Sequence, residues 1–269
     1  MGNKSVNYVI AAWSGLRRGK PRPTRNYKKY FEDRTYFLRF HLDFALKKQK
    51  NISHVTIVAP FNSEEEPKEF ARYLADMPAE INGIEVTVLR RENVGVSFGS
   101  FSFAFEKLGA EWDYYIFNED DHIPIAKDFD EKLITALEDA GPQCGCMCTW
   151  LRRDKHYKKN PVIGHLFSVA KSSVLSNVAK VNEGKLPYKL DVYSGLSADE
   201  FSHGFTKARY KISDMTDKYC AAYVKGDGRI WWVGGDRPSE YKVKGKEALI
   251  VPIEMWENHN REQREKAGM

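Results

Sequence analysis

The stretch YYIFNEDDHIP, residues 114–124, joins a run of aromatic and aliphatic residues directly to three consecutive acids. Residues 112–117 have the composition of a buried strand, so the acids at 119–121 follow its carboxyl end. Adjacent carboxylates repel one another, and a fold tolerates them more easily when a positive group lies among them. The stretch therefore predicts a cation site at a strand end. The alternative is that the acids only cap the next helix.

Strands and helices alternate on both sides of that stretch. Before it, the apolar pattern predicts strands over 7–12, 54–59 and 84–89 and helices over 30–49, 63–76 and 98–108, with a capping box at Ser63 and Glu66. This alternation predicts an α/β fold with a mostly parallel, Rossmann-like central sheet flanked by helices. Ligands of such sheets bind at the carboxyl ends of the strands, where the acids are expected.

The second half of the chain has a more mixed pattern. It predicts helices over 128–141 and 171–181, strands over 143–150 and 162–170, and a hairpin over 219–235. We find no internal repeat and no long linker. A single domain over residues 1–269 is expected, with a smaller mixed region beside the main sheet.

Positive charge is concentrated at the start of the chain. The first fifty residues hold 13 Lys and Arg against 3 acids, although the net charge of the whole chain is only +5. Most of this excess lies in residues 14–29, where Gly and Pro predict a loop. A basic loop indicates an anionic partner such as a diphosphate, a phospholipid head group or a nucleic acid. The alternative is a solvated loop without a partner.

The cysteines and the apolar runs bear on the compartment. Cys144, Cys146 and Cys148 alternate along one predicted strand, which favours small side chains in a tight core over the alternative of metal binding. No apolar run approaches the roughly 18 residues of a membrane span, and the N-terminal residues lack a signal-peptide pattern. We expect reduced thiols and a cytoplasmic protein.

Residues 93–129 carry a resemblance to a known family. Asn93, Gly95 and Ser97 lead into a helix with small residues, and the next strand ends in the acids at 119–121. This arrangement resembles the GT-A glycosyltransferases, which use nucleotide-sugars. The acids look like the EDD variant of the DxD-type motif in N-acetylglucosaminyltransferase-like members.

The resemblance implies a GT-A-like fold and a metal-dependent glycosyltransferase that moves a sugar from a nucleotide-sugar, expected to be UDP-linked, to a hydroxyl. The acceptor is left open among a glycan, a lipid-linked saccharide and a modified DNA base. Residues 1–122 are expected to bind the nucleotide-sugar and residues 123–269 the acceptor. Two alternatives remain, a sugar-phosphate nucleotidyltransferase and a non-enzymatic nucleic-acid-binding protein that uses the basic loop.

The same resemblance implies roles for individual residues. Asp121 and Asp120 are expected to hold Mn²⁺ or Mg²⁺, with His259 or His203 as a C-terminal ligand. The residues expected to bind the nucleotide-sugar are Ala11, Trp13, Arg17, Asn62, Asn93, Gly95, Ser97, Glu119 and Asp120.

An inverting transfer also requires a carboxylate that takes the proton of the attacking hydroxyl. A predicted loop and helix in the second half offer Asp199 and Glu200. Because Ser197 and Glu200 match a capping box, Asp199 is preferred as the base. Trp231 and Trp232 are expected to bind the acceptor, although only one of two adjacent strand residues faces a given side.

Overall fold

The protein is described by a computed structural model. The residues that the structure describes are 4–13, 33, 35–61, 66–152, 161–163, 167–190, 194–224, 230–233, 242–243, 246–253 and 255–257. At 194–197, 223–224, 230–233 and 242–243 it describes the backbone alone.

The described strands are β1 (Val6–Ala11), β2 (Ile52–Phe61), β3 (Glu80–Ile81), β4 (Ile84–Glu92), β5 (Tyr114–Glu119), β6 (His122–Pro124), β7 (Cys144–Cys148), β8 (Leu151–Arg152), β9 (Val162–Ile163), β10 (Ser168–Lys171), β11 (Lys211–Asp214), β12 (Tyr219–Val224), β13 (Ile230–Val233), β14 (Lys242–Val243) and β15 (Lys246–Pro252). The described helices are α2 (Tyr36–Asp43), the 3-10 helix η1 (Ala45–Lys48), α3 (Lys68–Ala75), α4 (Val96–Leu108), α5 (Phe129–Asp139), α6 (Ser172–Val181) and α7 (Ser194–Lys207).

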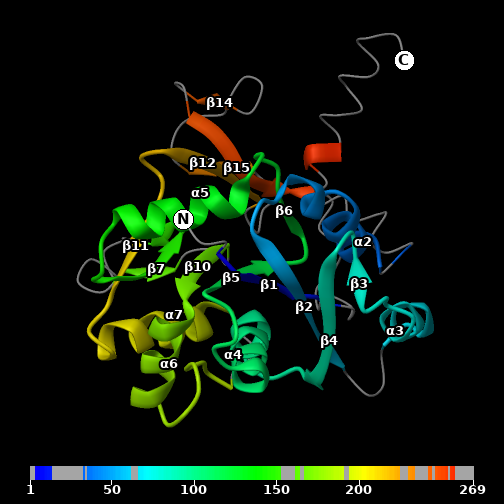
Figure 1. Ribbon diagram of the computed structural model, residues 1–269, viewed down its shortest axis with the longest axis horizontal. Helices are drawn as coiled ribbons and strands as arrows, with labels where there is room; N and C mark the ends of the chain where they lie inside the picture. The colour runs from blue at the N-terminus through cyan, green and yellow to red at the C-terminus, as the bar shows by residue number, and fades with distance from the viewer. Residues whose placement is uncertain are drawn as a thin grey trace.

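The larger sheet has the strand order β11-β7-β10-β5-β1-β2-β4-β3 (Figure 1). The central strand β1 is parallel to both β2 and β5, and β2 is parallel to β4. Strands β10 and β3 run antiparallel to their neighbours β5 and β4. The prediction of an α/β fold with a mostly parallel, Rossmann-like sheet flanked by helices is therefore confirmed.

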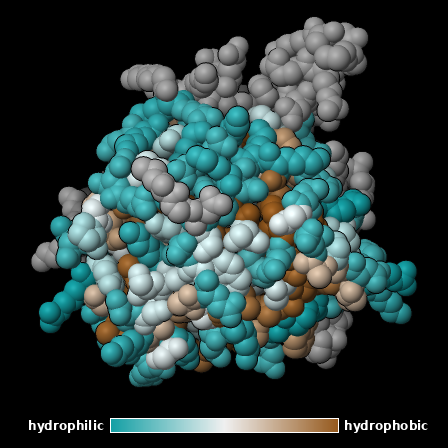
Figure 2. All heavy atoms as spheres, in the orientation of Figure 1, coloured by the Kyte–Doolittle hydropathy of each residue, from teal (hydrophilic) through white to brown (hydrophobic). Residues whose placement is uncertain are grey.

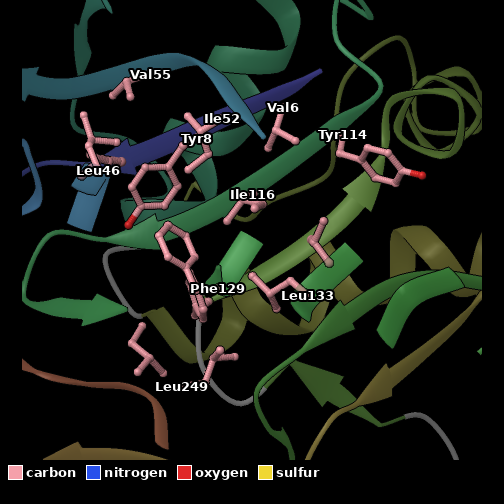
Figure 3. Packing of buried hydrophobic residues seen from close by; sticks show 14 of the residues in the cluster. Val6, Tyr8, Leu46, Ile52, Val55, Tyr114, Ile116, Phe129, Leu133 and Leu249 are labelled. Carbon is pink, nitrogen blue, oxygen red and sulfur yellow. The ribbon is translucent and has the colours of Figure 1, made fainter. Parts of the chain in front are cut away.

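Alternate residues of the central strands pack on opposite faces of this sheet. Tyr8 and Ile116 belong to the apolar cluster that includes α2, α3 and α5. Val9 and Phe117 belong to the cluster that includes α4, α6 and α7. Figure 3 shows Phe129 of α5 next to Tyr8 on the first of these faces. The strict alternation decides which way each side chain points where β5 ends.

A smaller mixed sheet adjoins the first, as the sequence predicted. It has the order β13-β12-β15-β14, and β6 pairs with β15. Only a turn separates β5 of the large sheet from β6 of the small one, and it contains the acids. We call Glu119–His122 the acid turn. The chain thus passes from one sheet to the other through the acid turn.

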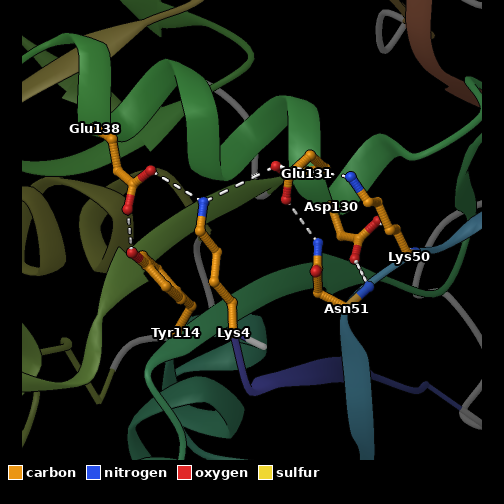
Figure 4. Close-up of polar contacts among 7 residues, drawn as sticks. All are labelled: Lys4, Lys50, Asn51, Tyr114, Asp130, Glu131 and Glu138. Carbon is orange, nitrogen blue, oxygen red and sulfur yellow. Dashed lines mark hydrogen bonds and ion pairs between the residues drawn. The ribbon is translucent and has the colours of Figure 1, made fainter. Parts of the chain in front are cut away.

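The amino ends of the strands are joined to α5 by polar contacts (Figure 4). Glu138 accepts a hydrogen bond from the Tyr114 hydroxyl (2.5 Å) and lies 3.0 Å from the Lys4 ammonium. Asp130 is fully buried and accepts the backbone N–H of Asn51 (2.5 Å). Burial raises the pKa of Asp130 above its usual range. These contacts tie α5, which packs on one face of the sheet, to the amino ends of the strands.

Ser63 of the first predicted capping box lies outside the described residues, and the other residues of the two boxes meet a different local structure. Helix α3 begins at Lys68 with Pro67 as its N-cap, and Glu66 accepts a hydrogen bond from Arg90 (2.5 Å) instead of capping. Helix α7 begins at Ser194, so the pattern of Ser197 and Glu200 lies inside the helix and the capping prediction there is wrong. A four-residue capping pattern is a weak signal, and a tertiary contact such as the hydrogen bond from Arg90 to Glu66 can override it.

The cysteine prediction agrees with the structure. Cys144, Cys146 and Cys148 are buried in β7 and their thiols are free. Burial raises the pKa of all three thiols, so they stay protonated. They serve as small apolar side chains in the core.

The described surface is largely polar. Its large exposed apolar side chains are Phe61, Val181 and Leu190. Figure 2 shows hydrophilic residues over most of the viewed face, with apolar residues gathered right of its centre. Among the described residues, the helices are all too short or too polar to span a membrane.

Phe129→Ala should lower the free energy of unfolding by about 3–5 kcal/mol, because it removes a fully buried ring. That ring lies 5.8 Å from the ring of Tyr8 and 6.0 Å from that of Phe167, so it joins α5 to β1 and to the residue just before β10. Urea unfolding measures the loss. The control is Val181→Ala at a side chain that is 40% exposed, which should cost less than about 0.5 kcal/mol. Equal losses in the two variants would contradict the described core.

Candidate functional site

The acid turn lies where the order of the sheet reverses. Strands β2 and β4 lie on one side of β1, and β5 lies on the other. The connections after β1 and β5 leave in different directions at such a point, and α/β sheets bind ligands in the crevice outside it. Ala12 and Trp13 follow β1 there, and the acid turn follows β5. The site is therefore a candidate for nucleotide or metal binding on position alone.

Three side chains of the acid turn meet in one group. Glu119, Asp121 and His122 each offer one ligand atom, and these atoms lie within 4.8 Å of one another. The Asp121 carboxylate lies 2.6 Å from Nδ1 of His122, and both side chains are largely buried. Carboxylate oxygens suit Mg²⁺ and Mn²⁺, and an imidazole nitrogen is compatible with Mn²⁺. The chemistry of this set fits a divalent cation.

Glu119 owes its orientation to the strand and to α4. Because β5 alternates, the Asn118 side chain points to the α2 and α5 face and Glu119 to the α4 face. The Ser97 hydroxyl in the first turn of α4 donates a hydrogen bond to Glu119 (2.6 Å). Of the predicted donor-binding residues Asn93, Gly95 and Ser97, it is Ser97 that the structure joins to the acid turn.

Asp120 points away from this group toward β1. Its carboxylate accepts the backbone N–H of Trp13 (2.8 Å), and its own N–H donates to the carbonyl of Ala11 (3.2 Å). The structure thus brings Asp120 together with Ala11 and Trp13, three residues predicted to bind the nucleotide-sugar. Asp121 lies in the possible ligand group, and Asp120 closes the end of β1 onto β5.

The ligands expected individually were Asp121, Asp120 and His259, whereas the ligand group contains Glu119 and His122 beside Asp121. Glu119 and Asp121 are two residues apart at a strand end, and that spacing was the available signal. Nothing in the sequence indicated that His122 would turn its Nδ1 toward Asp121.

The loop before α4 has an unusual backbone. Gly95 has φ +75°, and a Cβ there would overlap the ring of Tyr188. Val96 also has a positive φ, +53°, which is strained for a β-branched residue. Such strain is often found near functional sites. The loop sets the position of Ser97 and hence of Glu119.

A buried arginine holds this loop. The Arg91 guanidinium donates hydrogen bonds to the carbonyls of Val94 and Val96 and to the hydroxyl of Ser100. Arg91 is only 7% exposed, and a Cβ on Gly99 would lie 2.7 Å from both of its terminal nitrogens. Gly99 is therefore needed for close approach.

A chain of buried polar groups lies beneath the acid turn. The His41 imidazole contacts the Tyr8 hydroxyl through Nδ1 (3.0 Å) and the carbonyl of Asp120 through Nε2 (3.0 Å). The amide nitrogen of Asn118 donates to the same hydroxyl (2.8 Å) and to the carbonyl of His122 (3.0 Å). Burial lowers the pKa of His41 to about 4, so its imidazole is neutral near pH 7.

The proposed catalytic carboxylates lie within α7. Asp199 and Glu200 are inside the helix and do not open it, contrary to the predicted loop-to-helix layout. Glu200 lies 3.8 Å from the Lys189 ammonium. Phe201 packs α7 against α4, 5.0 Å from the ring of Phe98. The role of the two carboxylates stays a prediction.

Several predicted site residues cannot be placed. The basic loop at 14–29 with Arg17, and also Asn62 and His259, lie outside the described residues. Trp231 and Trp232 lie in β13, paired with β12, and only their backbone is described. His203 is described and its side chain is exposed on α7.

The comparisons with known proteins found similarity at the level of fold. No family model matches the chain, and no curated protein matches its sequence. The 4-diphosphocytidyl-2C-methyl-D-erythritol synthase of Anaerococcus prevotii is similar in structure, with 13% identity, a TM-score of 0.47, and coverage of 79% of this chain and 87% of that one. A cytidylyltransferase of Leptospira borgpetersenii has 13% identity and a TM-score of 0.47 over 78% and 75% of the two chains. A Bacillus anthracis protein named as a glucose-1-phosphate thymidylyltransferase has 12% identity and a TM-score of 0.46 over 84% and 88%.

The names of these structures differ from the predicted activity. All three are named for nucleotidyl transfer or the synthesis of a diphosphocytidyl compound, and none for glycosyl transfer. The glycosyltransferase prediction is contradicted by these names, which agree with its alternative, a sugar-phosphate nucleotidyltransferase, while the likeness itself is one of fold alone. The DxD assignment in the predicted resemblance to GT-A enzymes is not confirmed.

Gly99→Ala should destabilise the protein by about 1–3 kcal/mol, because the added methyl group overlaps the Val94 carbonyl and crowds Arg91. Helix propensity alone would make the Gly99→Ala protein about 1 kcal/mol more stable, so the two effects have opposite signs. Urea unfolding measures the change. A more stable variant would show that the close approach of Arg91 to α4 is wrong.

The stability of the protein should fall as the pH drops from 6.5 to 4, in part because of His41. Its folded pKa of about 4 lies below the ordinary value of 6.5, so the unfolded state binds the proton first. The contribution reaches about 3 kcal/mol and is fully lost near pH 4. Urea unfolding of wild type and His41→Gln at several pH values isolates it. Parallel stability curves for the two proteins would contradict a buried, neutral His41.

Proposed function

We propose that this protein is a metal-dependent nucleotidyltransferase that couples a nucleoside triphosphate to a phosphorylated sugar or sugar alcohol. The observation that carries the proposal is the group formed by Glu119, Asp121 and His122 at the carboxyl end of β5, where the strand order reverses. This is the position at which α/β sheets bind nucleotides. The names of the similar structures suggest the reaction, but their likeness is one of fold, so the argument rests on these residues.

In the proposed reaction, a phosphate oxygen of the second substrate attacks the α-phosphorus of the triphosphate. The bond from the α-phosphorus to the bridging oxygen breaks, and pyrophosphate leaves with the electron pair. Glu119, Asp121 and His122 are the residues that would hold Mg²⁺ or Mn²⁺. When bound, such an ion neutralises the negative charge of the phosphates.

The neighbouring residues have positioning roles in this proposal. Asp120 holds the backbone of Trp13 beside the acid turn, so the chain after β1 forms one wall of the nucleotide site. Ser97 holds Glu119 in place. We assign nucleotide binding to residues 1–122 and binding of the second substrate to residues 123–269.

This reaction does not need a general base. The second ionisation of a phosphate monoester has a pKa of about 6, so the attacking group is already ionised near pH 7. Asp199 and Glu200 then have no proton to accept. Their replacement by amides is expected to leave the chemical step intact.

The test is the reverse reaction, in which a nucleoside diphosphate sugar and pyrophosphate give a nucleoside triphosphate and a sugar phosphate. The wild type with Mn²⁺ or Mg²⁺ should form CTP, UTP or dTTP from one member of a panel of CDP-, UDP- and dTDP-linked compounds. Asp121→Asn removes a charged ligand and should reduce the rate by at least about 100-fold, since the ion is needed to offset phosphate charge. Chromatography of the nucleotides measures both.

Glu200→Gln is the matched control, since it also converts a carboxylate to an amide and is expected to keep the wild-type rate. Two results together would contradict the proposal. The protein would release a nucleoside diphosphate or monophosphate when no pyrophosphate is added, and it would form no triphosphate when pyrophosphate is added.

A further inference from the structure

The backbone carbonyls of Asp120, Asp121 and His122 in the acid turn are bonded to groups in the protein interior. The carbonyl of Asp120 meets His41, and the carbonyl of His122 accepts from Asn118. The carbonyl of Asp121 accepts the backbone N–H of Ile253 (3.1 Å). The turn is therefore held by three separate contacts.

The direction of each hydrogen bond in the buried chain follows from the groups themselves. A carbonyl only accepts, so Nε2 of His41 carries the proton and donates to Asp120. Nδ1 of a neutral His41 then accepts, and the Tyr8 hydroxyl donates to it. The hydroxyl oxygen of Tyr8 in turn accepts from Asn118. Each link depends on the next, and Tyr8 is the central one.

We propose that Tyr8, His41 and Asn118 are positioning residues that set the metal affinity of the acid turn. The proposal rests on the metal site of the proposed function. His41 and Asn118 hydrogen-bond the carbonyls of Asp120 and His122, which lie on either side of Asp121, and hold both carbonyls toward the interior. The side chains of Glu119, Asp121 and His122 are then the groups left to face a cation.

Electrostatics explains why such a grip is needed. The carboxylates of Glu119 and Asp121 lie close together, so their repulsion favours any backbone change that separates them before a cation arrives. The three residues of the chain come from β1, α2 and β5, and all are fully buried, so their hydrogen bonds resist that change. Groups that orient metal ligands from behind affect metal affinity strongly even though they do not touch the metal.

The test uses Tyr8→Phe, which removes only the hydroxyl at the centre of the chain. We expect the dissociation constant of Mn²⁺, measured by the electron paramagnetic resonance of the free ion, to rise about 10-fold or more. His41→Gln places an amide nitrogen that still donates toward the carbonyl of Asp120, so its rise should be smaller. Thermal unfolding followed by circular dichroism confirms that each variant is folded.

Tyr115→Phe is the matched control. Tyr115 is buried like Tyr8, but it lies near the amino end of β5, far from the acid turn. Its hydroxyl donates to the carbonyl of Gly109 (2.6 Å). It loses the same atom, so its melting temperature should fall similarly while its Mn²⁺ affinity stays within about twofold of wild type. Wild-type affinity in folded Tyr8→Phe, or an equal loss in Tyr115→Phe, would overturn the proposal.

Amide hydrogen exchange of residues 118–123 without metal gives a second measure. Tyr8→Phe should speed this exchange about 10-fold relative to Tyr115→Phe, and equal exchange would overturn the positioning role even if the wild type bound no Mn²⁺. A different result would contradict the proposed function alone: the wild type would bind Mn²⁺ through Asp121 but form no triphosphate. The positioning role would stand in that case.

Discussion

The parallel pairing of β1 with β5 is the constraint on which the candidate site depends. It places Ala11 opposite Glu119, so the two strands end at the same level. Asp120 then bonds to the backbone on both sides of that junction, through the carbonyl of Ala11 and the N–H of Trp13. Without this pairing the acids would follow an isolated strand end and have no wall opposite them.

The acid turn separates its carboxylates by sending them in different directions. Glu119 goes to α4, Asp120 to β1 and Asp121 to His122. The repulsion expected of three adjacent acids is thus reduced before any cation binds, because each finds a hydrogen-bond donor or a polar neighbour of its own. The same separation leaves Glu119 and Asp121 near enough to act together, which a plain helix cap would not require.

The turn also joins the two sheets, which gives it rigidity from both sides. Strand β6 begins at His122 and pairs with β15, and the carbonyl of Asp121 accepts from Ile253 just beyond that strand. Behind the turn, the buried hydroxyl of Tyr8 connects β1, α2 and β5. A binding site built in this way is supported by elements far apart in sequence, so its geometry depends on the whole of the central fold.

Local pattern was enough to predict the alternating strands and helices, the mostly parallel sheet and the acids at the end of β5, because strand and helix periodicities depend on neighbouring residues. It was not enough to separate the roles of Glu119, Asp120 and Asp121. Those roles depend on contacts with Ser97 and Trp13, which lie 22 and 107 residues away from their partners. It also misplaced the start of α7, which begins at Ser194 and so includes the residues expected to cap it. The sequence by itself thus determined the fold class and the position of the acids, and only the tertiary structure decided which side chains converge, because convergence is set by long-range hydrogen bonds.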